Sequence, residues 1–194
     1  MSGSNFVARE EGYVVCRGER FRVYLDRETI RNRVAELGKQ ISDDYEDVVP
    51  ILIGVLNGSF MFLADLLRGI EIECEVDFWK LSSYGAKKVS SGQVREIKKL
   101  DANLHGRDVV IVEDIVDTGL SMAYVVERIR EYQPASMRIA TLLHKEVATT
   151  EVDVRLDYVG FRIPDRFVIG YGLDYGQLAR NLPEIYILDP SIGS

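Results

Sequence analysis

Short apolar runs alternate with segments expected to be helical along most of this 194-residue chain. The runs at residues 48–53 and 108–112 consist largely of Val and Ile, as buried strands do. A turn is expected after the second run, followed by a helix at residues 118–132 that Pro134 would stop. Strands that alternate with helices are typical of a mainly parallel sheet flanked by helices. We therefore expect an α/β fold that binds its ligands beyond the carboxyl ends of the strands.

Other elements are predicted from apolar spacing and from residues that start or stop helices. Asp26 can cap a helix whose apolar positions recur at helical spacing as far as Ile41. The segment 72–80 alternates, so we expect a strand whose apolar even-numbered residues share one face. Residues 82–92 are rich in Ser, Gly and Lys, and a polar loop of this length is often functional. The remaining expected elements are a helix at 60–67 closed by Gly69, and strands at 137–143, 156–159, 167–169 and 185–188.

Composition restricts the partners of the chain. It carries 24 Lys and Arg against 31 Asp and Glu, a net charge of −7, which disfavours a nucleic-acid surface. The longest apolar stretch, residues 48–56, is too short to span a membrane, and the first residues lack the pattern of a signal peptide. Cys16 and Cys74 lie far apart and form no metal-binding motif. We expect a cytoplasmic protein that binds neither nucleic acid nor membranes.

The segment after the strand at 108–112 has the residue types of a phosphate and diol site. Glu113, Asp114 and Asp117 are followed directly by residues 118–121, Thr-Gly-Leu-Ser. A helix N-terminus with free N–H groups and neighbouring hydroxyls favours a phosphate. The carboxylates can accept hydrogen bonds from hydroxyls or bind Mg²⁺. The segment thus indicates a ligand with a phosphate and a diol; the alternatives are a simple acidic helix cap and a receiver-type phosphoacceptor domain.

Three motifs, in order along the chain, resemble those of one enzyme family. Residues 109–121 resemble the motif with which type I phosphoribosyltransferases bind 5-phosphoribosyl 1-pyrophosphate (PRPP). Residues 142–145 and 159–175 are similar to the 6-oxopurine branch, the hypoxanthine-guanine phosphoribosyltransferases. The resemblance extends over most of the chain, from about Tyr24 to Asp189.

The resemblance implies one phosphoribosyltransferase domain over residues 1–194. Its mainly parallel central sheet would be flanked by helices and joined to a small hood on the purine side. The hood is expected from about residues 160–194 together with the N-terminal segment, and the mobile lid loop at about 82–92. A lid fits the chemistry, because water would capture an exposed oxocarbenium-like ribosyl centre.

The resemblance also implies a purine-salvage enzyme that transfers 5-phosphoribosyl from PRPP to N9 of hypoxanthine or guanine, giving IMP or GMP and pyrophosphate. Asp117 matches the general base near purine N7, a role typically worth about 10²–10⁴-fold in rate. Lys145 matches the lysine that donates to the 6-oxo group, and Phe167 the ring that stacks on the purine. Because lysine can only donate, Lys145 would disfavour adenine, whose 6-amino group is itself a donor.

The remaining implied site residues fall into five groups. PRPP and nucleotide contacts are assigned to Glu113, Asp114, Ile115, Val116, Thr118, Gly119, Leu120 and Ser121. Further purine-side contacts are assigned to Val168 and Asp174, and lid contacts to Ser83 and Tyr84. Pyrophosphate contacts are assigned to Leu56, Asn57, Gly58 and Arg180. The cofactor Mg²⁺ is assigned to Asp174, Glu113 and Asp114.

One departure and two open points accompany the resemblance. Many family members carry lysine at the position of Asn57, so any contribution of a lysine charge there is lost. The alternative function is a PRPP-sensing, RNA-binding transcription regulator of the same fold, which would need a basic face. Family members are usually dimers or tetramers, so we expect a homodimer or homotetramer.

Overall fold

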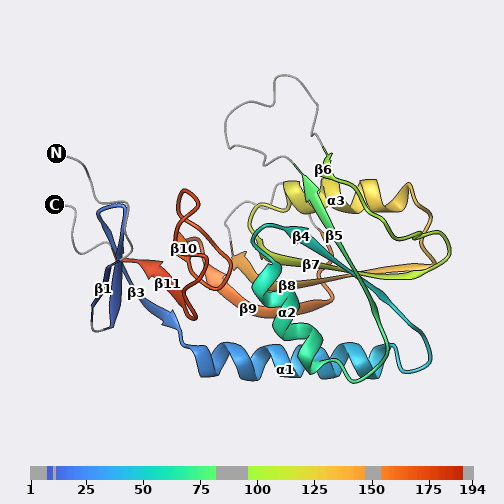
Figure 1. Ribbon diagram of the computed structural model, residues 1–194, viewed down its shortest axis with the longest axis horizontal. Helices are drawn as coiled ribbons and strands as arrows, with labels where there is room; N and C mark the ends of the chain where they lie inside the picture. Colours follow the sequence, from blue (N-terminus) through green and yellow to red (C-terminus); the bar gives the residue numbers. More distant parts are fainter. Residues whose placement is uncertain (1–7, 11, 82–95, 147–153, 190–194) are drawn as a thin grey trace.

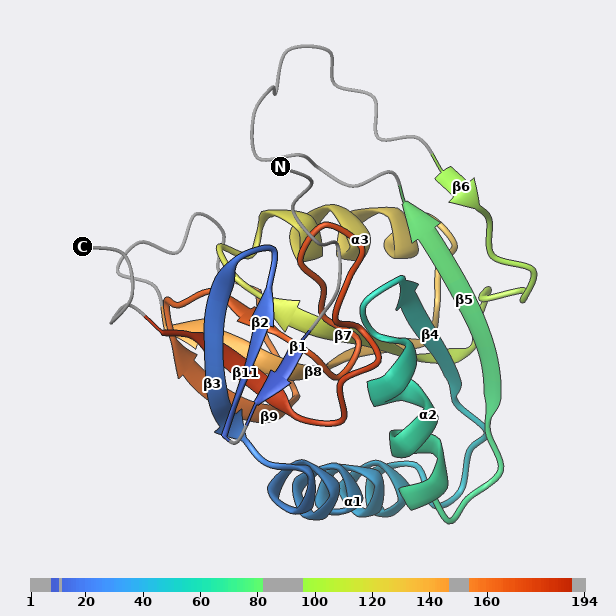
Figure 2. The same cartoon turned by 60° about the vertical axis from the view of Figure 1, so that its left-hand side comes forward.

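The computed structural model of the chain describes residues 8–10, 12–81, 96–146 and 154–189. Within these ranges, helices flank a six-stranded central sheet, and a second sheet of five strands lies at one end of it (Figures 1 and 2). This is the α/β fold expected from the alternation of strands and helices. The expected lid at 82–92 lies outside the described residues.

The central sheet has the strand order β6-β5-β4-β7-β8-β9. Its neighbouring strands run parallel, except that β6 is antiparallel to β5. The carboxyl ends of the parallel strands therefore share one edge, where the loops that follow them can meet. The strands are β4 (Ile51–Leu56), β5 (Glu75–Leu81), β6 (Glu96–Lys98), β7 (Asp108–Val116), β8 (Ser136–Glu146) and β9 (Tyr158–Pro164). The helices are α1 (Arg27–Asp44), α2 (Phe60–Gly69) and α3 (Leu120–Arg130).

Helices cover both faces of the central sheet (Figure 1). α1 and α2 pack on one face, against a core that includes Leu52 and Val110. α3 packs on the other face, against Ile51 and Val109. Because successive strand residues point to opposite faces, the same strands supply both cores. No helix in the described ranges is long and apolar enough to cross a membrane.

Segments from the beginning and the end of the described chain form the second sheet, which is antiparallel in the order β1-β2-β3-β11-β10. We refer to this sheet and residues 165–184 as the hood (Figure 2). It includes the N-terminal strands and part of the segment 160–194, but residues 160–164 belong to β9 of the central sheet. Its three N-terminal strands were not predicted as strands. The strands are β1 (Ala8–Glu10), β2 (Tyr13–Cys16), β3 (Glu19–Leu25), β10 (Val168–Ile169) and β11 (Ile185–Leu188).

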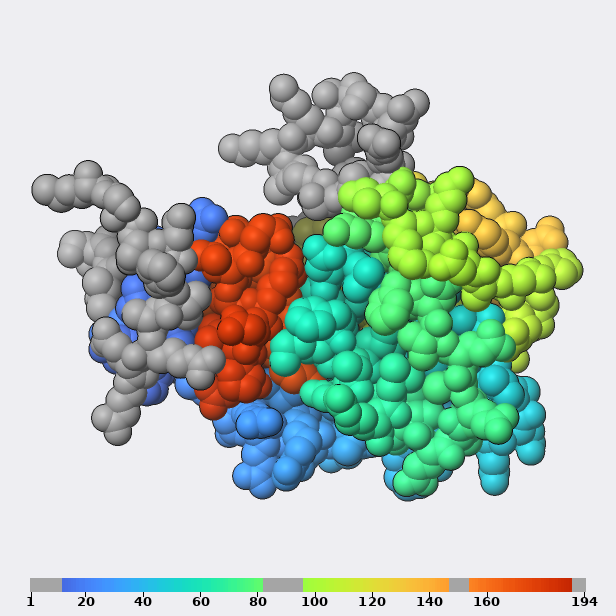
Figure 3. Space-filling model, in the orientation of Figure 1, coloured from blue at the N-terminus to red at the C-terminus, as the bar shows by residue number. Residues whose placement is uncertain are grey.

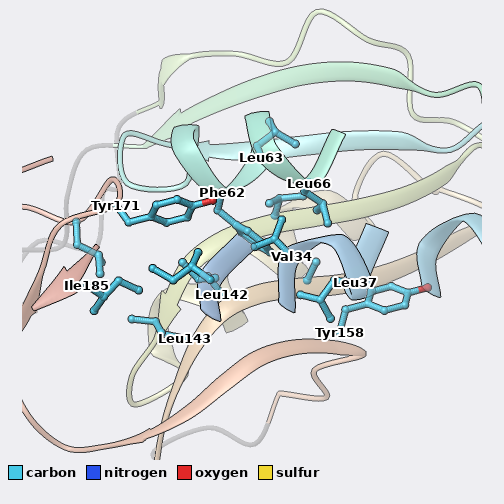
Figure 4. Packing of buried hydrophobic residues seen from close by; sticks show 14 of the residues in the cluster. Val34, Leu37, Phe62, Leu63, Leu66, Leu142, Leu143, Tyr158, Tyr171 and Ile185 are labelled. Atoms are coloured by element: carbon cyan, nitrogen blue, oxygen red, sulfur yellow. The ribbon is translucent and has the colours of Figure 1, made fainter. Parts of the chain in front are cut away.

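The hood shares a hydrophobic core with the central sheet (Figure 4). Leu37 from α1 and Phe62 from α2 belong to the same cluster as Leu142 from β8. Tyr171 and Ile185 extend this cluster into the hood. Burial of each large apolar side chain contributes about 1.5–3 kcal/mol, so this shared core fixes the hood against the sheet.

The first helix has the predicted boundary and the predicted buried face. The Asp26 carboxylate accepts a hydrogen bond from the Thr29 backbone N–H at 2.7 Å, which satisfies one free N–H of the first turn. The apolar positions from Ile30 to Ile41 that recur at helical spacing are buried against the sheet.

Several strand boundaries differ from the prediction because each strand runs only as far as it has hydrogen-bonded neighbours. β4 begins at Ile51 rather than at residue 48, and Val48 is 42% exposed. β7 continues past residue 112 to Val116, because its end pairs with the end of β8. β8 itself reaches Glu146, and β9 covers 158–164 rather than 156–159.

The predicted face of β5 was wrong at Val76. This residue is 41% exposed, whereas Asp77 and Trp79 are buried. Trp79 belongs to the core on the α3 side, and Phe78 packs at the edge of the other core. β5 lies next to the short edge strand β6, so its side chains are covered unevenly along its length.

Gly38 permits the close approach of α1 to α2, and we expect Gly38→Ala to lower the free energy of unfolding by about 1–3 kcal/mol. A Cβ at Gly38 would lie 2.6 Å from the backbone carbon and oxygen of Gly69, so the helices would have to move apart. Thermal denaturation would measure the loss. Gln40→Ala, on the exposed face of the same helix, should stay within about 0.5 kcal/mol of the wild type. Equal stability of both variants would contradict the prediction.

Candidate active site

The candidate site lies where the segments following β4, β7 and β8 meet the hood. The segment after β4 contacts the end of β7 through Gly58 and Asp114. The end of β8 contacts the loop after β7 through Lys145 and Asp117. The hood reaches the segment after β4 through Gly172. Figure 3 shows this last junction on the surface, where the red hood lies directly against the teal segment that includes α2.

Glu113 and Asp114 lie side by side near the end of β7 and are both half-buried. Burial and the neighbouring charge of Asp114 raise the pKa of Glu113 well above its ordinary value. Burial also raises the pKa of Asp114, against the opposing effect of the Arg180 charge. Two adjacent carboxylates of this kind are stabilised by a cation or by hydroxyl donors. The sequence prediction placed them in a turn, but they are strand residues because Ile115 and Val116 still pair with β8.

Gly58 holds the segment after β4 directly against Asp114. A Cβ at Gly58 would lie only 1.6 Å from Oδ2 of Asp114. A Cβ at Gly172, whose φ is +99°, would in turn lie 2.1 Å from the Gly58 carbonyl oxygen. The hood backbone at Gly172 therefore packs against the backbone at Gly58, which packs in turn against the Asp114 carboxylate. Neither contact leaves room for a side chain. Leu56 and Asn57, which precede Gly58, are joined by a cis peptide bond, and Asn57 is exposed.

A hollow of about 210 Å³ lies at the start of α3. Gly119 caps the helix in the left-handed conformation, with φ +87°, and no side-chain cap hydrogen bond is formed at this end. Such a helix start favours an anion. The hollow lies where the sequence predicted the phosphate, although α3 starts at Leu120 rather than at residue 118, and Leu120 does not line it. The lining residues are Glu113, Ile115, Val116, Asp117, Thr118, Gly119, Ser121 and Met122.

Lys145 links two carboxylates at the end of β8. Its Nζ donates to Oδ2 of Asp117 at 2.8 Å and to Oδ1 of Asp165 at 3.0 Å. The Lys145 side chain is only 13% exposed. Burial lowers its pKa, but the hydrogen bonds and charges of both aspartates outweigh burial and raise the pKa above its ordinary value. Lys145 is therefore a charged donor beside Asp117.

Phe167 presents a half-exposed aromatic ring at the hood. It is 43% exposed, and Val168 beside it is buried in β10. Its ring centroid lies 5.2 Å from that of Tyr175 and 6.1 Å from that of Phe21. These two rings support Phe167 by tilted or edge contacts.

The hood loop that carries Asp174 and Arg180 is held together by contacts of Arg180 and is tied to α2 through Tyr171. Nη2 of Arg180 lies 2.7 Å from Oδ1 of Asp174, and Nη1 donates to the Gly172 carbonyl at 2.8 Å. The Tyr171 hydroxyl donates to Oδ2 of Asp65 in α2 at 2.7 Å, and Figure 4 shows its ring directed toward that helix. The structure thus brings Arg180, Gly172 and the segment after β4 together.

With this geometry in place, comparison with known proteins identifies the family. Residues 23–176 match the phosphoribosyl transferase domain family. The hypoxanthine-guanine phosphoribosyltransferase of Bacillus subtilis is 46% identical over 171 residues, which cover 88% of this chain and 94% of that protein. The chain belongs to the hypoxanthine-guanine phosphoribosyltransferase family. This membership excludes a receiver domain.

Solved structures of phosphoribosyltransferases superpose on the chain. A hypoxanthine-guanine phosphoribosyltransferase from Bacillus anthracis, with a HEPES molecule in its active site, gives a TM-score of 0.80 at 38% identity and covers 86% of this chain and 98% of its own. A hypoxanthine phosphoribosyltransferase from Staphylococcus aureus gives 0.82 at 40% identity, with 89% and 94% covered. The type I phosphoribosyltransferase fold expected from the sequence is thereby confirmed.

The donor set of this phosphoribosyltransferase fits Mg²⁺ only in combination with a substrate. The described part of the chain contains no group of three or more His, Cys, Asp or Glu side chains placed to hold a metal. Glu113 and Asp114 are adjacent oxygen donors whose pKa values are raised mainly by burial of the two carboxylates. Mg²⁺ is usually bound by one or two carboxylates together with substrate oxygens and water. The pair therefore suits a cation that arrives with an anionic substrate.

Three side chains of the site in this phosphoribosyltransferase were not predicted from the sequence. Asp165 pairs with Lys145, and Phe21 and Tyr175 support the Phe167 ring. The position of Asp165, two residues before Phe167, was the one local signal available. Phe21 is separated from Phe167 by most of the chain, so no sequence spacing could connect them. The predicted lid residues Ser83 and Tyr84 lie outside the described residues.

Proposed function

We propose that this chain is a purine-salvage enzyme that transfers 5-phosphoribosyl from PRPP to N9 of hypoxanthine or guanine, releasing pyrophosphate and giving IMP or GMP. The observation that carries the proposal is the contact between Lys145 and Asp117 at 2.8 Å. It combines a charged donor with a carboxylate acceptor, the pair needed to recognise the O6 and N7 edge of a 6-oxopurine. The similarity to enzymes named for this activity supports it.

The PRPP half of the proposed site combines the hollow before α3 with the acids of β7. Thr118, Gly119 and Ser121 take the 5′-phosphate, because the free N–H groups and the positive end of the helix favour an anion. Glu113 and Asp114 accept hydrogen bonds from the ribose hydroxyls. Ile115, Val116 and Leu120 contribute through the backbone that shapes this loop.

In the purine half, Asp117 is the general base, Lys145 donates to the 6-oxo group and Phe167 stacks on the base. Asp117 takes a proton from N7 as the new bond forms at N9. Positioned general bases contribute about 10²–10⁴-fold, so positioning and charge stabilisation of the ribosyl centre supply the rest. Val168 meets the base edge through its backbone.

Mg²⁺ is the proposed cofactor, held by Glu113, Asp114 and Asp174 together with PRPP. When bound, it would neutralise charge on the pyrophosphate leaving group. The backbone of Leu56, Asn57 and Gly58 and the guanidinium of Arg180 contact the pyrophosphate. If these contacts come mainly from backbone N–H groups, asparagine at position 57 is compatible with binding.

In this proposal residues 1–194 act as one phosphoribosyltransferase domain. The hood, which consists of the five-stranded sheet and residues 165–184, covers the purine side. The loop at 82–92 serves as the lid, with Ser83 and Tyr84 closing over PRPP. The enzyme works in the cytoplasm on small molecules, as a homodimer or homotetramer.

A panel of four purines tests the function. We expect purified protein with PRPP and Mg²⁺ to consume hypoxanthine or guanine but not adenine, because Lys145 offers only donors to position 6 of the base. Xanthine completes the panel, and the relative turnover of the three 6-oxopurines shows which group at position 2 of the base the enzyme prefers. Formation of nucleotide and pyrophosphate would be followed by chromatography. Comparable turnover of adenine would contradict the assignment of Lys145. PRPP binding without turnover of any purine would favour the alternative function, a PRPP-sensing, RNA-binding transcription regulator.

A further inference from the structure

The side chain of Lys145 is held by a second carboxylate that the proposed reaction does not use. Asp165 lies in the turn between β9 and β10, directly after Pro164, whose Cα pairs with Glu146 at the end of β8. Its Oδ1 accepts from Nζ of Lys145 at 3.0 Å. Asp117 accepts from the same nitrogen at 2.8 Å but belongs to the loop after β7. Two separate segments therefore fix one ammonium group.

The number of donors on Lys145 matches this arrangement. An ammonium group has three N–H donors and no acceptor. Asp117 and Asp165 each take one of them, so one N–H remains for the carbonyl oxygen of a 6-oxopurine. Both ion pairs can thus persist while Lys145 contacts the base.

The turn that carries Asp165 is braced, although Asp165 itself is 65% exposed. The backbone N–H of Arg166 donates to the Pro164 carbonyl at 2.8 Å. The Arg166 side chain donates to the Leu188 carbonyl of β11 at 3.2 Å. Phe167, the proposed stacking ring, follows immediately. Asp165 therefore connects the lysine to the segment that carries the ring.

A single partner would leave Lys145 less well placed. Lysine is a point charge on a flexible four-carbon chain, so with Asp117 alone its ammonium would follow that carboxylate. The Asp117 carboxylate would then be more fully occupied by its ion pair with Lys145, although the reaction requires this carboxylate to accept a proton. A second, fixed carboxylate on the hood side holds the ammonium between the two.

We propose that Asp165 is a positioning residue for 6-oxopurine recognition, which holds Lys145 so that its third N–H points to the base while Asp117 stays available. The proposal rests on the proposed function, since it assumes that Lys145 contacts the purine. It assigns no direct contact between Asp165 and the substrate.

Burial of the lysine distinguishes this ion pair from an ordinary surface pair. Lys39 and Asp43 on α1 lie 3.1 Å apart, and Asp43 is 64% exposed, almost the same as Asp165. Lys39, however, is 71% exposed, whereas Lys145 is 13% exposed. Exposed pairs contribute little to stability, but a partly buried ammonium depends on its partners for position. Asp43→Asn is therefore a matched control.

The test compares steady-state kinetics of Asp165→Asn, Asp165→Glu and Asp43→Asn. We expect Asp165→Asn to raise KM for hypoxanthine about two- to fivefold, the upper range of an ion pair with one exposed partner, with KM for PRPP and the melting temperature unchanged. Asp165→Glu keeps the charge and should restore most of the affinity for hypoxanthine. Asp43→Asn should match the wild type in every measurement.

Lys145→Gln separates failure of this proposal from failure of the proposed function. If Lys145→Gln raises KM for hypoxanthine and Asp165→Asn does not, Asp165 has no positioning role and the function stands. If Asp165→Asn raises the KM values for hypoxanthine and PRPP equally, or lowers the melting temperature, its role is structural and the proposal is overturned. If Lys145→Gln leaves KM for hypoxanthine unchanged, both the lysine assignment and this proposal fail.

Discussion

Replacement of Asp117 by Asn is expected to lower kcat by about 10²–10⁴-fold and to leave PRPP affinity nearly unchanged. The amide can still accept a hydrogen bond from Lys145, so the local geometry is kept, but it cannot take a proton from the purine. Asp117 is 48% exposed, so we expect the substitution to leave the fold intact. Single-turnover kinetics with hypoxanthine would measure the chemical step, and titration with PRPP and Mg²⁺ would measure binding.

Asp101→Asn provides the control for the loss of one negative charge. Asp101 pairs with Lys98 at 3.0 Å, is 87% exposed and lies outside the candidate site. We expect wild-type kinetics from this variant. Near-normal turnover of Asp117→Asn would show that another group, or water, accepts the proton. A kcat loss accompanied by an equal loss of PRPP affinity would assign Asp117 to binding instead.

The parts of the fold that depend on local pattern could be predicted from the sequence. The Asp26 cap and the apolar spacing of α1 both act within a few residues, and the structure contains both. The acids that end β7 stand directly before the helix start, so chain connectivity alone brings Glu113 and Asp117 to one hollow. Lys145 could be placed beside Asp117 only through the family resemblance. The two residues are 28 positions apart in the sequence and are brought together by the pairing of β7 with β8.

The parts that could not be predicted depend on contacts between distant segments. The hood sheet joins β3 to β11. The strand at residues 185–188 was predicted, but the strand at 19–25 was not, and neither sequence indicates that the two segments pair. Val76 is exposed because the neighbouring edge strand β6 is short. The alternation of apolar residues along β5 did not indicate this exposure. Asp165 reaches Lys145 only because β9 lies beside β8. Secondary structure within a segment was therefore more predictable than its partners.

Gly58→Ala is expected to raise KM for PRPP and to lower kcat/KM for PRPP by about 10- to 150-fold. The methyl carbon would lie only 1.6 Å from Oδ2 of Asp114, which is a severe clash. Either the carboxylate or the segment after β4 must therefore shift. A displaced Asp114 loses charge-assisted hydrogen bonds, each worth about 1.5–3 kcal/mol, which corresponds to the expected factor. KM for hypoxanthine should change much less, because the purine half of the site does not contact Gly58.

A double-mutant cycle with Asp114→Ala tests whether Asp114 carries this effect. If the two residues act through one contact, Gly58→Ala should add little to the loss caused by Asp114→Ala, and the coupling energy should be large. The melting temperature of each variant shows whether the fold survives. Additive losses in the cycle would mean that Gly58 serves PRPP through its own backbone N–H, independently of Asp114. An unchanged KM for PRPP in Gly58→Ala would mean that the carboxylate can turn away from the methyl group and still bind substrate.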